Sequence, residues 1–229
     1  MRYLLALMFG LAVSTAQNPV LAQTPPGAAE ISRYTGLHEA AATGNIAEIS
    51  RLVSAGRPIN AHDGNLRTPL HVAVYTHQYD AARALMQLGA DANALDAQKY
   101  DIVTIASVDN DVGMLKIALE GGCKATNITS PYNGTALIAA AHLGHADVAR
   151  TLIAAKAPLD HVNNLGWTAL IESIVLGNGG KGHTDTLDAL VKAGANVNIA
   201  DRESNTPLTL AKRRGYTEMV AILEKAGAK

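Results

Sequence analysis

Cysteine is almost absent from this chain, which has one among 229 residues. A single thiol cannot form an internal disulfide, so a disulfide-stapled fold is excluded and the folded state must be stabilised by packing. That residue, Cys123, stands where alanine stands at corresponding places in the chain, Ala90, Ala157 and Ala195. We therefore predict a small buried side chain, because a reactive thiol needs an exposed electropositive site.

An excess of charge of either sign is also missing, since the chain has 19 basic and 20 acidic residues. Nucleic-acid binding requires a basic surplus, so we predict no nucleic-acid partner. Aromatic residues are few, with one Trp, one Phe and seven Tyr. Their positions are informative, because Trp and Tyr dominate the energetics of protein interfaces.

The N-terminal apolar run, Leu4 to Val13, falls well short of the ~20 residues that a membrane-spanning helix needs. It follows the basic start Met1-Arg2 and precedes the small residues Ala16 and Ala22, the pattern of a cleaved secretory signal. We predict a signal peptide over residues 1–22, cleaved after Ala22 in preference to Ala16, and a linker over residues 23–33. The mature protein is then periplasmic or secreted and has no membrane association. The alternative is an uncleaved membrane anchor.

What the chain does contain is a repeat. The segment Thr68 to Ala73, with the sequence TPLHVA, recurs in altered copies that begin at Thr35, Asp101, Thr135, Thr168 and Thr206. The intervals between consecutive copies are 33, 33, 34, 33 and 38 residues. Self-similarity at a nearly fixed period is the signature of a stacked array, in which each unit is stable only against its neighbours.

These copies resemble the ankyrin repeat family. Its pattern runs from TPLHxA through a Gly-His turn to an apolar helix ending in Gly-Ala-Asp-x-Asn, and is matched at Thr68–Ala73, Gly144-His145, Gly182-His183, Gly89–Asn93 and Gly194–Asn198. The resemblance covers residues 34–229. It implies an all-α ankyrin-repeat solenoid of six helix-turn-helix repeats joined by β-hairpin-like loops. It also implies a non-enzymatic scaffold whose hairpin tips and first helices form a concave surface that binds a partner protein.

The helical spacing of apolar residues predicts which side chains are buried. In each repeat the first helix has small and apolar residues at i, i+3 and i+4, as in Leu70, Ala73 and Val74, and the second helix repeats the pattern, as in Ala82, Leu85 and Met86. The sixth repeat has Lys212 and Glu224 at such positions. A polar outer face is expected of an end repeat, so we expect the array to end there.

Two departures from the family's pattern concern loops. The turn before each Thr usually has Gly two residues ahead, yet only Gly166 follows this rule, and the other turns have Leu66, Lys99, Asn133 and Ser204. Because positive φ favours glycine, we expect these hairpin tips to be irregular. The fifth repeat also has five extra residues within Gly177–Gly182. A phosphate loop there would need a preceding strand and a Gly-Lys-Ser/Thr ending, so we predict a tolerated surface insertion.

Residues for catalysis are hard to assemble. Four of the eight histidines occupy positions of the repeat pattern, and the other four come from different repeats, whereas a zinc site needs three or four converging ligands. No Gly-x-Ser-x-Gly elbow is present. We predict no enzyme activity, no cofactor and no metal. A hydrolase or metal-binding protein that uses His142 and the Gly177–Gly182 insertion remains the alternative.

The repeat register also places residues on the concave surface of the resembled family. The projected tip positions include Arg67, and the residues that we expect to bind a partner protein are Tyr75, Tyr100, Tyr132, His142, Leu165, Trp167, Leu176, Arg202, Arg213 and Arg214. Tyr, Trp and Arg are the residue types that dominate interface energetics. In the alternative interpretation, Tyr100 and Trp167 merely pack between neighbouring hairpins. The identity of the partner is left open, and we expect a monomer.

Overall fold

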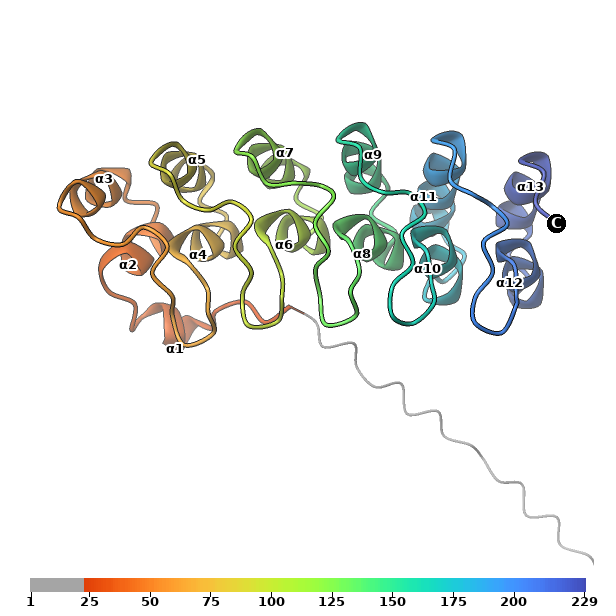
Figure 1. Ribbon diagram of the computed structural model, residues 1–229, viewed down its shortest axis with the longest axis horizontal. Helices are drawn as coiled ribbons and strands as arrows, with labels where there is room; N and C mark the ends of the chain where they lie inside the picture. The colour runs from red at the N-terminus through yellow and green to blue at the C-terminus, as the bar shows by residue number, and fades with distance from the viewer. Residues whose placement is uncertain (1–22) are drawn as a thin grey trace, which may run out of the picture.

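The computed structural model describes residues 23–229, so the predicted signal peptide lies outside the described residues. Figure 1 shows two rows of helices, with the first helix of each repeat in one row, the second helix in the other, and hairpin loops projecting on the side of the first row. The first row is α2 (Gly36–Ala42), α4 (Pro69–Tyr75), α6 (Ile102–Val108), α8 (Ala136–Leu143), α10 (Ala169–Val175) and α12 (Pro207–Arg214). The second row is α3 (Ile46–Ser54), α5 (Tyr79–Gln87), α7 (Val112–Glu120), α9 (Ala146–Ala154), α11 (Lys181–Lys192) and α13 (Thr217–Lys225).

The all-α prediction is confirmed, because residues 23–229 form helices and loops with no strand and one isolated bridge, between Thr129 and Gly134. The six helix pairs stack in sequence order, each helix packing against its partner and against the equivalent helix of the next repeat. This is the predicted solenoid of helix-turn-helix repeats.

The residue that opens each repeat fixes where its first helix begins. Thr68 accepts a hydrogen bond from the His71 backbone N–H, and Thr135, Thr168 and Thr206 cap their helices in the same way, whereas Thr35 makes no side-chain cap. Asp101 replaces Thr in the third repeat and still accepts from Thr104 N (2.8 Å), so the helix start there is conventional. A side-chain oxygen at this position satisfies an amide that the helix leaves unpaired.

One continuous core joins the repeats. The predicted first-helix positions, such as Leu70, Ala73 and Val74, are buried, and so are the first two positions of each second-helix stripe. The third position of those stripes, Met86 for example, is only half-buried and packs against the core. Cys123 is buried as predicted, and burial raises the pKa of its thiol, which keeps the thiol protonated and unreactive.

The sixth repeat is polar at the two predicted places. Lys212 and Glu224 are exposed and form an ion pair with each other, Nζ to Oε1, at 2.7 Å. The inner side of the same repeat keeps Ala211, Met219 and Leu223 buried against the fifth repeat. The charged pair therefore covers the outer side of the last helix pair.

Residues 23–33, which we expected to form a linker, are folded onto the array. They contain the short helix α1 (Ala28–Ile31) and run beneath the hairpins of the first repeats (Figure 1). Thr24 and Gln98 exchange two hydrogen bonds, from Thr24 N to Gln98 Oε1 (3.1 Å) and from Gln98 Nε2 to Thr24 Oγ1 (3.3 Å). We call residues 23–33 the N-terminal segment.

Candidate functional site

Five hairpins join the repeats, and their tips with the exposed ends of the first helices form the surface that we call the hairpin face. Hairpins 1 to 5 are residues 63–67, 96–100, 130–134, 163–167 and 201–205. In each tip the side-chain oxygen of the first residue accepts hydrogen bonds from the backbone N–H groups two and four residues later. These residues are Asp63, Asp96, Ser130, Asn163 and Asp201.

This shared oxygen explains why the expectation of irregular tips was wrong for hairpins 1, 2 and 5. Leu66, Lys99, Asn133 and Ser204 have φ of 57°, 63°, 51° and 62°, the left-handed conformation that Gly166 adopts at 86°. A non-glycine residue is strained there, and the two hydrogen bonds to the tip oxygen offset that strain. Hairpins 1, 2, 4 and 5 therefore have one repeated backbone shape. Hairpin 3 differs, because Ser130 also has a positive φ of 64° and the closing hydrogen bond runs from Thr129 N to Gly134 O.

Hydrogen bonds between the tips make the hairpin face one connected surface. Backbone amides of hairpins 2, 3 and 4 each donate to a carbonyl of the preceding hairpin at 2.9 Å: Ala97 to Asn65, Ser130 to Lys99, and Asn164 to Tyr132. Hairpin 5 is joined differently, because Arg202 Nη2 donates to Asn164 O (2.5 Å). Arg202, which we predicted to bind a partner, therefore also has a structural contact.

The N-terminal segment contacts hairpins 1 and 2. Arg67 is only 1% exposed and is held by Asp63 (Nε to Oδ2, 2.8 Å), by Glu30 and by the Thr24 carbonyl. Tyr34 donates to the same Oδ2 atom of Asp63 (2.7 Å). Burial alone would raise the pKa of Asp63, but the hydrogen bonds from Tyr34 and Arg67 outweigh it and hold the pKa below its ordinary value. Arg67, projected as an exposed tip residue, is thus part of a buried polar network.

Tyr100 also requires a correction. It is 5% exposed and belongs to the core, and its carbonyl accepts a hydrogen bond from His71 Nε2 at 3.2 Å. The last tip position is buried in every hairpin except the fourth, and Tyr100 packs between hairpins, as in the alternative interpretation. Tyr75 is half-buried and donates to Asp96 Oδ2 (3.3 Å). The expected binding residues nearest the N-terminus, Tyr75 and Tyr100, therefore make contacts within the protein and have little surface left for a partner.

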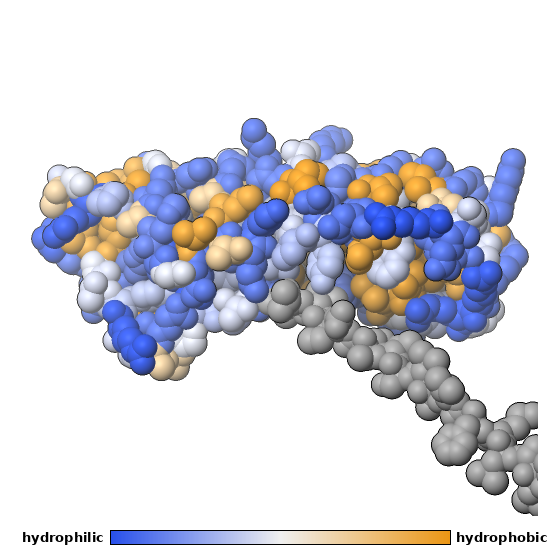
Figure 2. Space-filling model, turned by 60° about the horizontal axis from the view of Figure 1, so that its bottom comes forward, coloured by the Kyte–Doolittle hydropathy of each residue, from blue (hydrophilic) through white to orange (hydrophobic). Residues whose placement is uncertain are grey.

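The other expected residues lie together on hairpins 3 to 5 and on α8, α10 and α12, which pack side by side. Leu165 is 38% exposed and Arg202, Arg213 and Arg214 are exposed, whereas Tyr132, His142, Trp167 and Leu176 are half-buried. Leu143, which the repeat register also places on this surface, is exposed, and Val162 adds exposed apolar surface that the prediction did not include. Figure 2 shows an apolar area on this C-terminal half of the hairpin face. Burying such a patch against a partner is favourable.

Glu172 is a functional candidate that the sequence prediction missed. It lies on α10 and is 3% exposed, and its Oε1 accepts a hydrogen bond from Asn163 Nδ2 of hairpin 4 at 2.9 Å. Its Oε2 lies 3.8 Å from His142 Nδ1 of α8, beyond hydrogen-bonding distance. Burial raises the pKa of this carboxyl to about 7, although the Asn163 hydrogen bond opposes the shift.

A comparison between repeats could have identified Glu172. The equivalent positions hold Val72, Ile105 and Ala139 in the other inner repeats and Glu39 and Leu210 in the two end repeats, so Glu172 is the one carboxylate at this place within the inner repeats. Its neighbour His142 has a pKa lowered mainly by burial and secondarily by His183. The uncharged imidazole therefore does not neutralise Glu172 at neutral pH.

The alternative of a metal site or hydrolase finds little support in the geometry. Within residues 23–229 no group of three or more His, Cys, Asp or Glu side chains is placed to hold a metal ion. The Gly177–Gly182 insertion is tied to the next repeat, because the Tyr216 hydroxyl donates to the Gly177 carbonyl (2.9 Å). The last two residues of the insertion, Lys181 and Gly182, begin α11. His183 Nε2 donates a hydrogen bond to the backbone carbonyl of His142 (2.9 Å). The imidazole of His183 therefore contacts the backbone of His142, and the two rings are not arranged as a pair of metal ligands.

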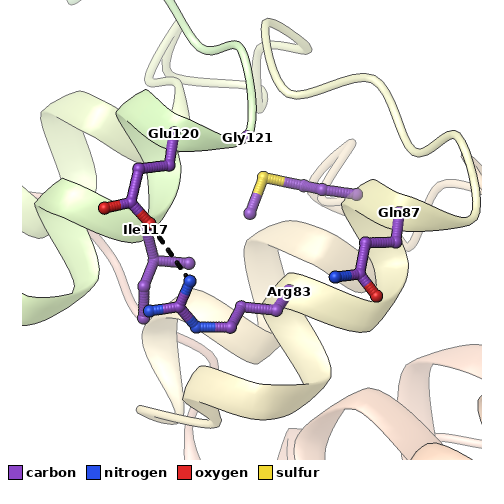
Figure 3. A pocket seen from close by; sticks show the side chains of 6 residues that line it. Arg83, Gln87, Ile117, Glu120 and Gly121 are labelled. Carbon is purple, nitrogen blue, oxygen red and sulfur yellow. Dashed lines mark hydrogen bonds and ion pairs between the residues drawn. The ribbon is translucent and has the colours of Figure 1, made fainter.

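The second helices form the opposite side of the molecule and present a shallow pocket between α5 and α7. Figure 3 shows Arg83 and Glu120 pointing toward each other across it, joined by an ion pair at 3.1 Å. The pocket is lined mainly by side chains of these two helices and contains no residue of the hairpin face. Across residues 23–229, no helix combines the length and the apolar character needed to cross a membrane.

Comparisons with known proteins agree with this architecture. The family model described as ankyrin repeats (3 copies) matches residues 7–96 and 103–201, and the one described as ankyrin repeats (many copies) matches residues 180–224. The ankyrin repeat protein YahD of Escherichia coli (strain K12) is 31% identical over 190 residues, which cover 82% of this chain and 94% of YahD.

Two solved structures share the fold. An ankyrin repeat domain from Acinetobacter baumannii is 43% identical, with a TM-score of 0.80 over 84% of this chain and 98% of that chain. The second structure is a chain from the complex of the Bd0816 predatory endopeptidase of Bdellovibrio bacteriovorus with immunity protein Bd3460. It is 22% identical, with a TM-score of 0.69 over 84% of this chain and 98% of that chain. At that identity the second likeness concerns the fold alone. With family models matching most of its length and the repeats stacked in order, this chain belongs to the ankyrin repeat family.

Proposed function

We propose that this protein is exported and holds a partner protein on the C-terminal half of its hairpin face, formed by hairpins 3 to 5 with α8, α10 and α12. The ankyrin repeat domain is a protein–protein interaction scaffold, and the family models that match the chain describe no catalytic family. The observation that carries the choice of surface is the position of the N-terminal segment. It engages hairpins 1 and 2 through Arg67 and Gln98, and the exposed apolar residues Leu143, Val162 and Leu165 lie beyond it.

The proposal of export rests on the sequence of residues 1–22, with its basic start, apolar run and small residues before Gln23. In a bacterial envelope two kinds of partner fit an exported scaffold: an enzyme whose activity or stress resistance it supports, and a toxin that it neutralises. The endopeptidase–immunity protein complex among the structures of similar fold makes an enzyme partner worth testing first. The hairpin face has mixed apolar and basic character, with Leu165, Arg202, Arg213 and Arg214 exposed, which suits a folded protein surface.

Capture from the native envelope tests this function. The full chain with a C-terminal tag should be recovered from the osmotic-shock fraction with Gln23 as its first residue, together with a stoichiometric partner. The double variant Leu165→Ala/Trp167→Ala should lose the partner, because truncating interface anchors weakens binding by at least ~2 kcal/mol each, roughly 30-fold. Quantitative mass spectrometry of the eluates measures the loss.

A variant of the opposite side provides the control. Arg83→Ala/Glu120→Ala removes the exposed ion pair between α5 and α7 and should leave capture unchanged. Equal capture by the hairpin-face variant and the wild type would reject this surface. Recovery of the chain only from the cytoplasmic fraction, with residues 1–22 retained, would reject export.

A further inference from the structure

Glu172 Oε2 is a buried carboxylate oxygen to which no residue among 23–229 donates a hydrogen bond. An acceptor left unpaired in the interior destabilises a protein by about 1–3 kcal/mol, and more when it is charged. The other oxygen of this carboxylate is satisfied by Asn163, which also shapes the tip of hairpin 4 through its own Oδ1. The position of Glu172 is therefore well defined, and only one of its oxygens lacks a donor.

The groups around Glu172 do not supply that donor. His142 Nδ1 lies 3.8 Å from Oε2, beyond hydrogen-bonding distance. Hairpin 4 contributes Asn163, whose amide is already bound to Oε1. From α11, His183 contacts the backbone of His142 and not the carboxylate. No donor among residues 23–229 therefore lies within hydrogen-bonding distance of Oε2.

His142 lies in the last turn of α8, its side chain is 28% exposed, and its Nδ1 is 3.8 Å from Oε2. The same half of the hairpin face has the exposed Leu143 of α8, the half-buried Leu176 that follows α10, and the half-buried Trp167 of hairpin 4. Because Oε2 is itself buried, a group of a partner could reach it only if the His142 side chain moved outward. The surroundings favour a donor carried by an otherwise apolar segment.

We propose that Glu172 is the specificity-determining acceptor of the hairpin face, and that it pairs with a lysine or arginine of the partner protein flanked by apolar residues. A cationic donor supplies the missing hydrogen bond and a compensating charge, which makes such a pair stronger than a neutral one. This inference rests on the proposed function, because it names the chemistry that the same surface recognises. It predicts the nature of the partner's contact residue and not its identity.

A random linear peptide library displayed on phage tests this without the native partner. Selection on the wild-type protein at pH 8, where the carboxyl is ionised, should enrich peptides with Lys or Arg beside apolar residues. A synthetic selected peptide should bind Glu172→Gln roughly 10- to 100-fold more weakly, the range expected when a hydrogen bond to a charged group is lost. Replacing its basic residue with glutamine should weaken binding to the wild type but add no further loss on Glu172→Gln, as coupled partners require.

Glu120→Gln is the matched control, because it removes an exposed carboxylate from α7, on the side of the molecule opposite the hairpin face. It should change the affinity by less than about 3-fold, as expected for a screened surface charge. Selection of peptides without basic residues, equal binding to Glu172→Gln, an equal loss with Glu120→Gln, or no enrichment at all would each overturn the inference. If selected peptides are lost with Leu165→Ala/Trp167→Ala yet ignore Glu172, the proposed function stands and only this inference fails.

Discussion

Arg67→Ala is expected to lower the free energy of unfolding by about 3–5 kcal/mol, the cost of breaking a buried ion pair by removing one partner. The variant leaves the buried Asp63 carboxylate without its cationic partner and removes the contacts that hold Glu30 and Thr24. Chemical denaturation measures the change in stability. Limited proteolysis should show faster cleavage within residues 23–33, because the N-terminal segment loses its main attachment to hairpin 1.

Arg51→Ala provides the control for this prediction. Arg51 also forms two hydrogen bonds with a carboxylate, that of Glu48 at 2.7 Å, but both side chains are exposed on α3. Exposed pairs of this kind contribute little, so no measurable change is expected. Similar destabilisation by the two variants, or an N-terminal segment that stays protected in Arg67→Ala, would mean that the buried network does not hold the segment.

Glu172→Gln should stabilise the protein at high pH. The free energy of unfolding of the variant minus that of the wild type should be about 3 kcal/mol larger at pH 8 than at pH 4.5. The folded-state pKa of about 7 is above the ordinary value of 4.5, so the folded protein holds this proton more tightly than the unfolded chain. The stabilisation is fully present below pH 4.5 and is lost as the pH rises toward 7, after which the wild type contains a buried charge. Glutamine does not ionise, so the stability of Glu172→Gln lacks this pH dependence.

Denaturant unfolding at a series of pH values, with both proteins side by side, measures this difference. The other groups near Glu172 are His142 on α8, Asn163 on hairpin 4 and His183 on α11 behind His142, and they are common to both proteins. Glu203→Gln, on the exposed tip of hairpin 5, should differ from the wild type by less than about 0.5 kcal/mol at every pH. A constant difference between wild type and Glu172→Gln across the series would mean that Glu172 ionises as it does in water.

The fold could be predicted because the repeat pattern specifies local structure six times over. Each copy gives a capping residue at its start and apolar residues at helical spacing, so an error in one unit, such as Asp101 in place of Thr, does not change the result. The shape of the hairpin tips could not be predicted from glycine positions alone. Their conformation depends on the oxygen of residues such as Asp63 and Asp96, which compensates for a non-glycine residue three positions later.

The candidate site was predictable only in part. Register places Leu165, Arg202 and Arg213 on the surface, but it cannot tell which tips the chain itself covers, since the contact between Thr24 and Gln98 joins residues 74 positions apart. For the same reason Arg67 was assigned to the surface although it is buried, whereas Tyr100 was assigned there although it packs into the core between hairpins. Glu172 was missed because a charged residue in a helix is ordinarily exposed, and its burial depends on packing between α8, hairpin 4 and α10.

Hydrogen–deuterium exchange of the protein with and without its captured partner tests the central claim most directly. The claim is that the stacked helix pairs leave the C-terminal half of the hairpin face free to hold another protein. Binding should slow exchange in residues 130–134, 163–167 and 201–205 and leave the second helices α5 and α7 unchanged. Protection confined to the second helices, or to hairpins 1 and 2 after displacement of residues 23–33, would contradict it.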